Sequence, residues 1–285
     1  MMNILVGIDG TERGIRAARW ALAHAKRDGG EVTLLAVIDN VIGDHTGLES
    51  DVLENAIQKA LDDKVAEIAP THQGVKISTR VVSGPVIESI VKISADYDMI
   101  AVGSHHGRSI SDVIGGAKGL RIAVAAPVPT VVVPADWDAE AAGSGIVTGV
   151  GPGEPTDAPQ LEFAALEAED QNDTLTVVGS WGASGWIQKT AQFMGANQQK
   201  LGDVRKCEIE ERVIRLAEKH PQLQITPCCV ENPSAAHALI EASEGSAMLV
   251  LGTDDRSVIK RKLFGGVAHS VLSSLHQPTA IVPKA

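Results

Sequence analysis

Basic residues are in short supply in this chain. Of its 285 residues, 25 are Lys or Arg and 36 are Asp or Glu, and the formal net charge is −11. Binding along a nucleic-acid backbone requires clustered Lys and Arg side chains that displace counterions. The charge balance therefore argues against nucleic acid as a partner. It does not argue against a mononucleotide, which needs only a local pocket.

Cysteine is also scarce. Cys207, Cys228 and Cys229 are too few, and wrongly spaced, for a disulfide framework or a zinc site. Two of them are adjacent in an expected strand, so their side chains point to opposite faces of a sheet. We expect all three to be packing residues.

Long apolar runs are absent. No window of the sequence approaches the roughly 18 apolar residues that a membrane helix requires. The chain enters a strand directly at Asn3–Val6, without the basic and apolar regions that are typical of a signal peptide. We therefore expect a cytoplasmic protein that does not bind a membrane.

What the sequence does contain is a long internal repeat. Residues 99–134 match residues 248–283 without a gap, at a constant offset of 149 residues (248 − 99). The identical pairs are Met99/Met248, Gly103/Gly252, Ile110/Ile259, Gly116/Gly265, Pro129/Pro278, Thr130/Thr279, Val133/Val282 and Pro134/Pro283. A repeat of this length indicates two copies of one domain. We expect domains over residues 1–135 and 145–285, joined by a short polar linker.

Each copy alternates short apolar runs with helical patterns. Strands are expected over residues 4–8, 32–38, 75–82, 99–102 and 130–133 in the first copy. In the second copy they are expected over residues 146–150, 175–178, 223–230, 248–251 and 279–282. Strands that alternate with helices in this way predict an α/β fold. We expect two tandem doubly wound domains, each a five-stranded, mainly parallel sheet flanked by helices.

The helices of the first copy have start signals and apolar stripes. The first begins after an N-cap at Thr11, and its inward stripe is Ile15, Ala18, Ala21 and Leu22. The inward residues of the second are Val52, Ile57, Leu61 and Val65. The third begins at Pro85, which suits a helix start because it lacks an N–H, and the fourth follows Gly116. In the second copy, residues 181–202 are the least regular stretch, either a flap or an interface loop.

Two glycines flank the loop after the fourth strand. Gly103 ends the strand and Gly116 opens the next helix. Open parallel sheets bind ligands at the carboxyl ends of their strands, near the point where the strand order reverses. A helix N-terminus offers unpaired N–H groups to a phosphate, and glycine lets the backbone approach it closely. The spacing therefore favours a phosphate site, although ordinary strand–helix loops also contain such glycines.

Two segments of the first copy carry a resemblance to the universal stress protein family. One is residues 102–109 (VGSHHGRS), followed by Gly116 and by residues 125–134 (AAPVPTVVVP), and the other is residues 4–11 (ILVGIDGT). The resemblance covers essentially the whole chain as two tandem copies, and it implies an adenine nucleotide alpha hydrolase-like fold. In the ATP-binding branch of that family the loop pattern is G-x2-G-x9-G-[S/T]. The resemblance implies that this loop holds the phosphates. It also implies that the first-strand Asp and a Val at the end of the second strand hold ribose and adenine.

Carried over position by position, the resemblance implies a nucleotide site in the first copy. The residues are Gly7, Asp9, Val37, Val102, Gly103, His106, Gly107, Gly116, Ala117 and Lys118. Two positions depart from the pattern, because His106 stands where the middle glycine is expected and Ala117 stands where the hydroxyl is expected. Losing one hydrogen bond to a charged oxygen costs about 1.5–3 kcal/mol, against roughly −8 kcal/mol for micromolar binding. Lys118 or Arg108 would offset part of that loss.

The second copy departs further, so we expect its nucleotide site to be degenerate. Asp255 takes the place of the middle glycine and Gly266 that of the hydroxyl, while Gly151-Pro152 replaces Asp9-Gly10. A carboxylate about 5 Å from a phosphate charge is repelled by about 3 kcal/mol at an effective dielectric constant near 20. The nearby basic residues 260–262 either form a solvated helix start or admit another anion.

No catalytic triad, carboxylate dyad or activated cysteine is evident, so we assign no catalytic residue. Asp9 would support a Mg²⁺-bound nucleotide, but hydrolysis also requires a positioned water and a base. We expect at most weak ATP hydrolysis, with Mg²⁺ present only together with nucleotide. His105 and His106 are adjacent and lack a third ligand, so no metal site is expected there.

Two functional hypotheses follow. In the first, the chain is a stress-responsive regulator that binds ATP or a related adenine nucleotide in its N-terminal domain and changes its contacts with a protein partner. In the second, it is a nucleotide-independent protein-interaction module of the same family. In either case we expect the last strands of the two copies to pair as an intramolecular pseudo-dimer, which would cover their exposed edges. Further homodimerisation stays open.

Overall fold

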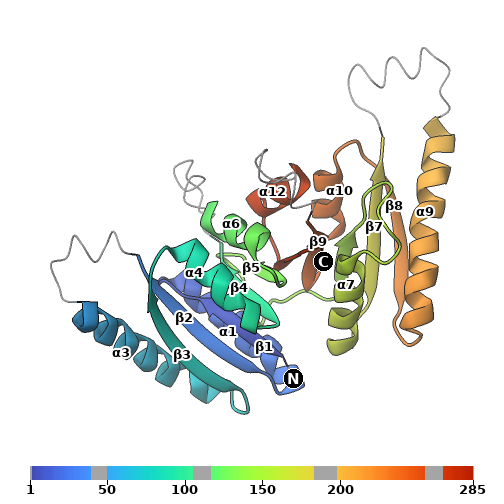
Figure 1. The fold of residues 1–285 in the computed structure, drawn as a ribbon. Helices are drawn as coiled ribbons and strands as arrows, with labels where there is room; N and C mark the ends of the chain where they lie inside the picture. Colours follow the sequence, from blue (N-terminus) through green and yellow to red (C-terminus); the bar gives the residue numbers. More distant parts are fainter. Residues whose placement is uncertain (1, 40–49, 105–116, 183–197, 254–265, 285) are drawn as a thin grey trace. The chain divides into compact units, whose positions relative to one another are not determined.

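The chain divides into two compact units, Met1–Ala141 and Ala142–Ala285. The structure is a computed structural model, and it describes residues 2–39, 50–104, 117–182, 198–253 and 266–284. Figure 1 shows the helices and strands of each unit. The predicted pairing of the two last strands stays a prediction.

The first unit is built on a parallel sheet of five strands. They are β1 (Asn3–Gly7), β2 (Glu31–Ile38), β3 (Lys76–Ser83), β4 (Met99–Gly103) and β5 (Thr130–Val133). Their order in the sheet is β3-β2-β1-β4-β5, and every neighbouring pair is parallel. The chain first moves outward from β1 to β3 and then crosses back to β4. The strand order therefore reverses between β1 and β4, where an open parallel sheet binds its ligand.

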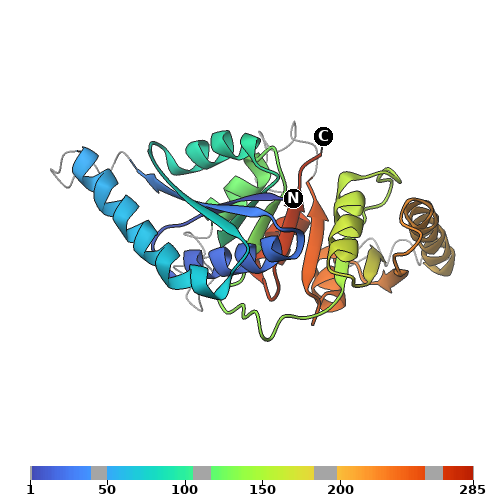
Figure 2. The same ribbon diagram turned by 90° about the horizontal axis from the view of Figure 1, so that it is seen from below.

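Helices cover both faces of this sheet. They are α1 (Glu12–Asp28), α3 (Ser50–Ile68), α4 (Val86–Ile93) and α6 (Ala117–Ala125). Because parallel crossovers are right-handed, the reversal of strand order moves the later helices to the opposite face. Figure 2 shows α1 and α3 together below the sheet and α4 above it.

The first helix follows the sequence closely. The hydroxyl oxygen of Thr11 accepts a hydrogen bond from the backbone N–H of Gly14, and Gly29 closes the helix with φ +69°. Only glycine adopts such a left-handed cap without strain. The predicted stripe of Ile15, Ala18, Ala21 and Leu22 is buried, with 0–2% of each residue exposed. These predictions are confirmed.

The inward face of α3 is partly different from the prediction. Val52 is 53% exposed, so its assignment to the inward face is wrong, whereas Leu61 is 6% exposed. Leu53, Ile57 and Leu61 are spaced four residues apart and lie on one side of the helix. Val52 lies about 140° from Ile57 around the helix axis and therefore cannot share that side.

The second unit repeats the same architecture. Its strands are β6 (Ile146–Gly149), β7 (Leu175–Trp181), β8 (Ile225–Glu231), β9 (Met248–Gly252) and β10 (Thr279–Val282), in the order β8-β7-β6-β9-β10. Its helices are α7 (Pro159–Asp170), α9 (Gln198–Lys219), α10 (Ala235–Ala242) and α12 (Gly266–Ser273). The predicted fold class, two tandem doubly wound α/β domains, is confirmed. Most of the irregular stretch 181–202 lies outside the described residues.

The three cysteines differ in their environments. Cys228 and Cys229 are half-buried on β8, but Cys207 is exposed on α9, so the expectation that all three are packing residues is wrong for Cys207. Burial raises the pKa of the Cys229 thiol. A raised thiol pKa keeps Cys229 protonated, and unreactive, near neutral pH.

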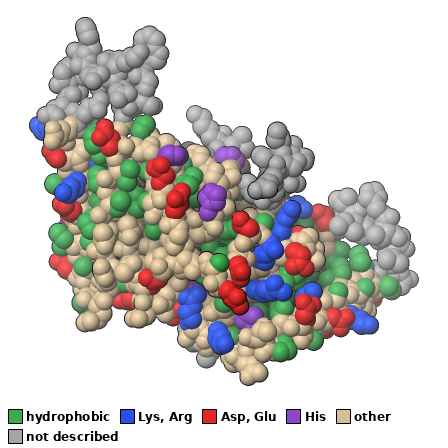
Figure 3. Space-filling view, turned by 180° about the vertical axis from the view of Figure 1, so that it is seen from behind, with side chains coloured by type: hydrophobic (Ala, Val, Ile, Leu, Met, Phe, Trp, Pro, Cys, Tyr) green, Lys and Arg blue, Asp and Glu red, His purple; other side chains and the backbone are tan. Residues whose placement is uncertain are grey.

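Charged side chains of both signs mix on the surface. On the side seen in Figure 3, Lys and Arg side chains are interspersed with Asp and Glu among the described residues. That side therefore offers no continuous basic surface for a nucleic-acid backbone. None of the described helices combines the length and apolar character needed to cross a membrane.

The different environments on α3 predict different costs of truncation. Leu61→Ala should lower the free energy of unfolding by about 2 kcal/mol, since it removes a buried side chain that borders a cavity. Val52→Ala should change it by less than about 0.5 kcal/mol, because that side chain already contacts water. Urea denaturation followed by circular dichroism measures both. Equal losses for the two variants would contradict the orientation of α3.

Candidate functional site

A cavity of about 550 Å³ opens at the carboxyl ends of β1, β2 and β4 in the first unit. Ligand pockets for nucleotide-sized molecules are typically about 300–1,000 Å³. The cavity lies at the reversal of the strand order. Its position and volume together make it the candidate binding site among the described residues.

Most of the residues predicted from sequence line this one cavity. They are Gly7, Asp9, Val37, Val102, Gly103 and Lys118. Ala117 begins α6 directly before Lys118. His106, Gly107 and Gly116 lie outside the described residues, so their predicted roles stay predictions.

The carboxylate of Asp9 is held at the wall of the cavity by the start of α1. Its Oδ1 accepts a hydrogen bond from the backbone N–H of Thr11 at 3.0 Å and another from the Thr11 hydroxyl at 2.6 Å. Between them, Gly10 has φ +78°, a conformation that favours glycine. The turn is therefore fixed by the capping of α1, and Asp9 is oriented without any ligand.

The close packing of β4 against α1 requires a glycine at position 103, whether or not a ligand is bound. A Cβ on Gly103 would lie 2.5 Å from the carbonyl oxygen of Arg13 in α1. Gly119, one turn into α6, has more room, since its Cβ would lie 3.7 Å from Val102 Cγ2. Both glycines line the cavity, but of the two only Gly119 can take a Cβ without displacing backbone.

The lining of the cavity is divided by chemistry. On the β2 side it is mainly apolar, formed by Val37 and by Leu53, Ile57 and Leu61 of α3, with Asp39 and Lys64 as its charged members. On the β4 side, the glycine backbone at Gly103 is followed by the cation Lys118 at the start of α6. Asp9, at the end of the central strand β1, lies between these two sides in the strand order. From β2 through β1 to β4, the wall of the cavity thus offers an apolar surface, a carboxylate and a cation. The base, sugar and phosphates of a nucleotide have the complementary chemistry in the same order.

Sequence reasoning missed the contribution of α3. It assigned Ile57 and Leu61 to the core and overlooked Leu53 and Lys64, which also line the cavity. Lys64 is directed along its own helix, because its Nζ pairs with Glu67 at 2.7 Å. The i, i+4 spacing of Leu53, Ile57 and Leu61 would have indicated their common face.

The second unit has a different turn at the equivalent place. Val150 donates its N–H to the carbonyl of Val178 as Ile8 does to Leu35, so Val150 corresponds to Ile8. Gly151 and Pro152 therefore correspond to Asp9 and Gly10 of the first unit. Proline cannot adopt the positive φ of Gly10, so this turn must take another path.

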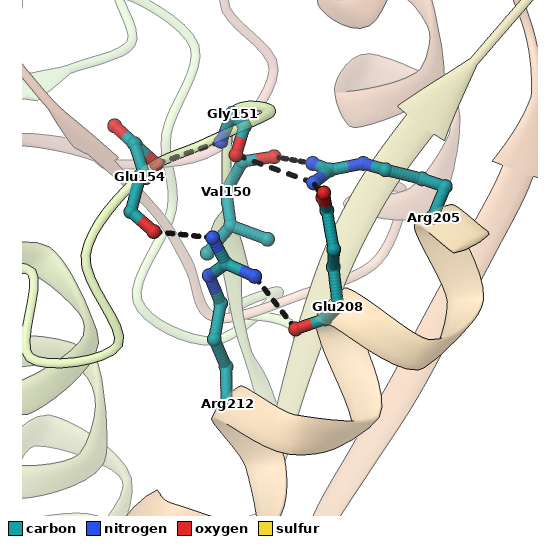
Figure 4. A network of polar contacts seen from close by, with 6 residues as sticks. All are labelled: Val150, Gly151, Glu154, Arg205, Glu208 and Arg212. Atoms are coloured by element: carbon teal, nitrogen blue, oxygen red, sulfur yellow. Dashed lines mark hydrogen bonds and ion pairs between the residues drawn. The ribbon is translucent and has the colours of Figure 1, made fainter.

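Arginine side chains surround that second turn (Figure 4). Arg205 of α9 donates to the carbonyl of Gly151 at 3.2 Å and also to the carbonyl of Val150. Arg212 donates to the backbone carbonyl of Glu154. The turn also donates the N–H of Gly151 to Glu154 Oε2 at 2.7 Å, so in the second unit it is bonded to a carboxylate and to two guanidinium groups.

The fold and site define a class: two tandem α/β units, one of which has a nucleotide-sized cavity at its topological switch point. Comparison with family models matches the universal stress protein family over residues 1–134 and again over residues 145–283. The chain therefore belongs to the universal stress protein family, and the predicted resemblance is confirmed.

Relatives named as universal stress proteins align with nearly the whole chain. A universal stress protein of Mycolicibacterium smegmatis is 24% identical over 289 residues, which cover 98% of this chain and 96% of that protein. One from Mycobacterium tuberculosis is 26% identical over 277 residues, with 95% and 92% covered. The crystal structure of a universal stress protein from Archaeoglobus fulgidus matches with a TM-score of 0.69 at 15% identity and covers 99% of this chain and 98% of that one. The similarity to the Archaeoglobus fulgidus structure shows that the two chains share a fold.

The two cavity glycines should respond oppositely to alanine. Gly103→Ala should lower the free energy of unfolding by about 1–3 kcal/mol, because the new methyl group meets the Arg13 backbone. Gly119→Ala should raise it by roughly 0.5–1 kcal/mol, because it removes a glycine from a helix where the new methyl group makes only ordinary van der Waals contacts. Thermal and urea unfolding of both variants check this. A stable Gly103→Ala protein would show that the close approach to α1 is not a constraint.

Proposed function

We propose that the first unit binds an adenine nucleotide, with ATP as the expected ligand, and that the chain acts as a nucleotide-responsive regulator in the stress response. The observation that carries the proposal is the meeting of Asp9, Val37, Gly103 and Lys118 in one cavity. These residues lie far apart in the sequence. They come from the ends of three neighbouring strands and from the start of α6.

The division of the cavity suggests how the ligand lies. The adenine ring would pack against Val37 and the apolar face of α3, and the ribose hydroxyls would donate to Asp9. The phosphates would lie near Gly103 and Lys118, where the N-terminus of α6 adds a partial positive charge. Mg²⁺ would accompany the phosphates. No step of hydrolysis is assigned, because Oδ1 of Asp9 is already bonded to Thr11 and no general base has been identified among the described lining residues.

Regulation requires that the nucleotide bind two states of the protein differently. The phosphates would contact the side of the cavity formed by β4 and α6. Only a ligand with phosphates would contact this side, so a triphosphate and a nucleoside would affect it differently. A protein partner that contacts this side would sense the occupancy of the cavity.

Blocking the cavity should abolish binding without unfolding the protein. Native mass spectrometry and calorimetric titration with ATP and Mg²⁺ should give one nucleotide per chain. Gly119→Leu places a side chain in the cavity beside Gly103 and should weaken binding at least about tenfold, or ~1.4 kcal/mol.

Ala268→Leu is the matched control. Ala268 is the equivalent of Gly119 in the second unit at the repeat offset of 149 residues (268 − 119), and its substitution should leave binding unchanged. Two nucleotides per chain would contradict the degenerate second site. No binding at millimolar ATP to the folded wild-type protein would favour the alternative, a nucleotide-independent interaction module.

The role of Lys118 is tested by comparing ligands. Lys118→Ala should weaken ATP binding by about threefold to tenfold, since it removes an exposed cation near the phosphates. Adenosine, which has no phosphate, should bind both proteins equally. The ATP affinity of the wild type should also fall with added salt more than that of the variant. An equal loss for adenosine and ATP would place Lys118 away from the phosphates.

A further inference from the structure

The helix that borders the cavity in the first unit has a counterpart in the second. Ser83 ends β3 opposite Ile38, and Glu231 ends β8 opposite Trp181, so these strands correspond at an offset of 148 residues (231 − 83). The helix before each strand can be compared at the same offset, which aligns α3 with α9. Ile57 and Lys64, which line the cavity, then correspond to Arg205 and Arg212.

Both arginines are buried. Arg205 is 4% exposed and Arg212 is 5% exposed. Arg205 donates to two carbonyls of the turn after β6, those of Val150 and Gly151, and pairs with Glu208 Oε2 at 2.6 Å. Arg212 bridges the carbonyl of Glu208, at 2.6 Å, to the carbonyl of Glu154. Figure 4 shows both guanidinium groups pointing from α9 toward this turn.

The surrounding residues fit closely around these side chains. Gly179 corresponds to the cavity residue Ala36, and a Cβ there would lie 2.9 Å from the guanidinium of Arg205 and 2.5 Å from Ile209 Cδ1. Glycine at this position makes room for the arginine. Ala36 borders the cavity in the first unit. Its equivalent in the second unit, Gly179, is therefore covered by side chains of α9.

The two ends of the second cleft are filled as well. The indole of Trp181 packs on Gly202, where a Cβ would lie 2.7 Å from the ring. The side chain of Gln160 packs on Gly252, the equivalent of Gly103, where a Cβ would lie 2.6 Å from Gln160 Oε1. In the first unit, the atoms nearest to a Cβ on the corresponding Gly103 belong to Arg13, and Gly103 borders the cavity.

The geometry points to an arginine plug: Arg205 and Arg212 act as a permanent internal ligand that occupies the cleft of the second unit and binds its turn. Arg205 is paired with the carboxylate of Glu208, and the printed contacts of Arg212 are to the backbone carbonyls of Glu208 and Glu154. Entry of a nucleotide would require that two buried guanidinium groups be expelled and that three carbonyls lose their donors. This inference concerns the second unit alone and does not depend on nucleotide binding by the first.

The plug is tested by removing one guanidinium and supplying it again as a small molecule. Arg205→Ala should lower the melting temperature of the full chain by roughly 10 °C, because buried polar partners are left unpaired. Millimolar ethylguanidinium should restore part of that loss. Hydrogen exchange followed by mass spectrometry should place both effects in residues 142–285.

The matched control is Arg215→Ala on the same helix. Arg215 is 57% exposed and pairs only with Glu211 among the contacts described, at 3.1 Å. Its replacement should change the melting temperature little and create no response to ethylguanidinium. If Arg205→Ala and Arg215→Ala behaved alike, or if ethylguanidinium failed to stabilise a folded Arg205→Ala protein, the plug would be refuted.

A measurement on the wild-type protein covers the case in which Arg205→Ala does not fold. The Nε atoms of Arg205 and Arg212 are buried and have no hydrogen-bond partner among the described residues. With ¹⁵N-labelled arginine, two Nε–H signals should exchange slowly with water, and saturating ATP should leave them protected. Rapid exchange of all arginine Nε–H signals, or loss of that protection on adding ATP, would overturn the inference.

Discussion

In the first unit, the hydrogen bonds from Thr11 to the carboxylate of Asp9 hold the turn between β1 and α1, and the site depends on that turn. The bonds satisfy polar groups at the start of the helix, which would otherwise need a partner. They also fix the carboxylate at the switch point of the sheet, on the wall of a cavity. One capping interaction thus stabilises a helix and positions the only predicted acidic ligand-binding group. Because the geometry is set by the fold itself, a ligand that binds there does not bear the cost of ordering the turn.

The second unit keeps the fold and changes the contents of the cleft. Its strands have the same order and its first strand has the same register, yet its turn carries Gly151 where the first unit has Asp9. The turn is held from the opposite side of the cleft, by guanidinium groups that donate to its carbonyls. The second turn keeps an acceptor side chain, since Glu154 Oε2 accepts from the N–H of Gly151 at 2.7 Å, and it gains guanidinium donors to its carbonyls. Shared architecture therefore does not imply shared binding, and each cleft has to be judged from its own residues.

Much of the fold can be predicted from the sequence. The strands are apolar runs flanked by turns, and the stripe of α1 follows a helical period, so both are local signals. The orientation of Val52 is mispredicted because two adjacent apolar residues, Val52 and Leu53, both occur at the start of α3, and only Leu53 has the four-residue spacing to Ile57. In the first cleft, the predicted residues meet because parallel strands bring their carboxyl ends to one edge. The arginines of the second cleft are not predictable in the same way. Arg205 contacts Gly151 across 54 residues, and nothing in the sequence near either residue indicates the pairing.

A crystal structure of the full chain grown with ATP and Mg²⁺ tests the central claim most directly. Electron density for the nucleotide should lie between Asp9 and Val37, with its phosphates near Lys118, while the guanidinium groups of Arg205 and Arg212 remain on the turn after β6. Density beside Gly151 with the arginines displaced, and none beside Asp9, would contradict the account.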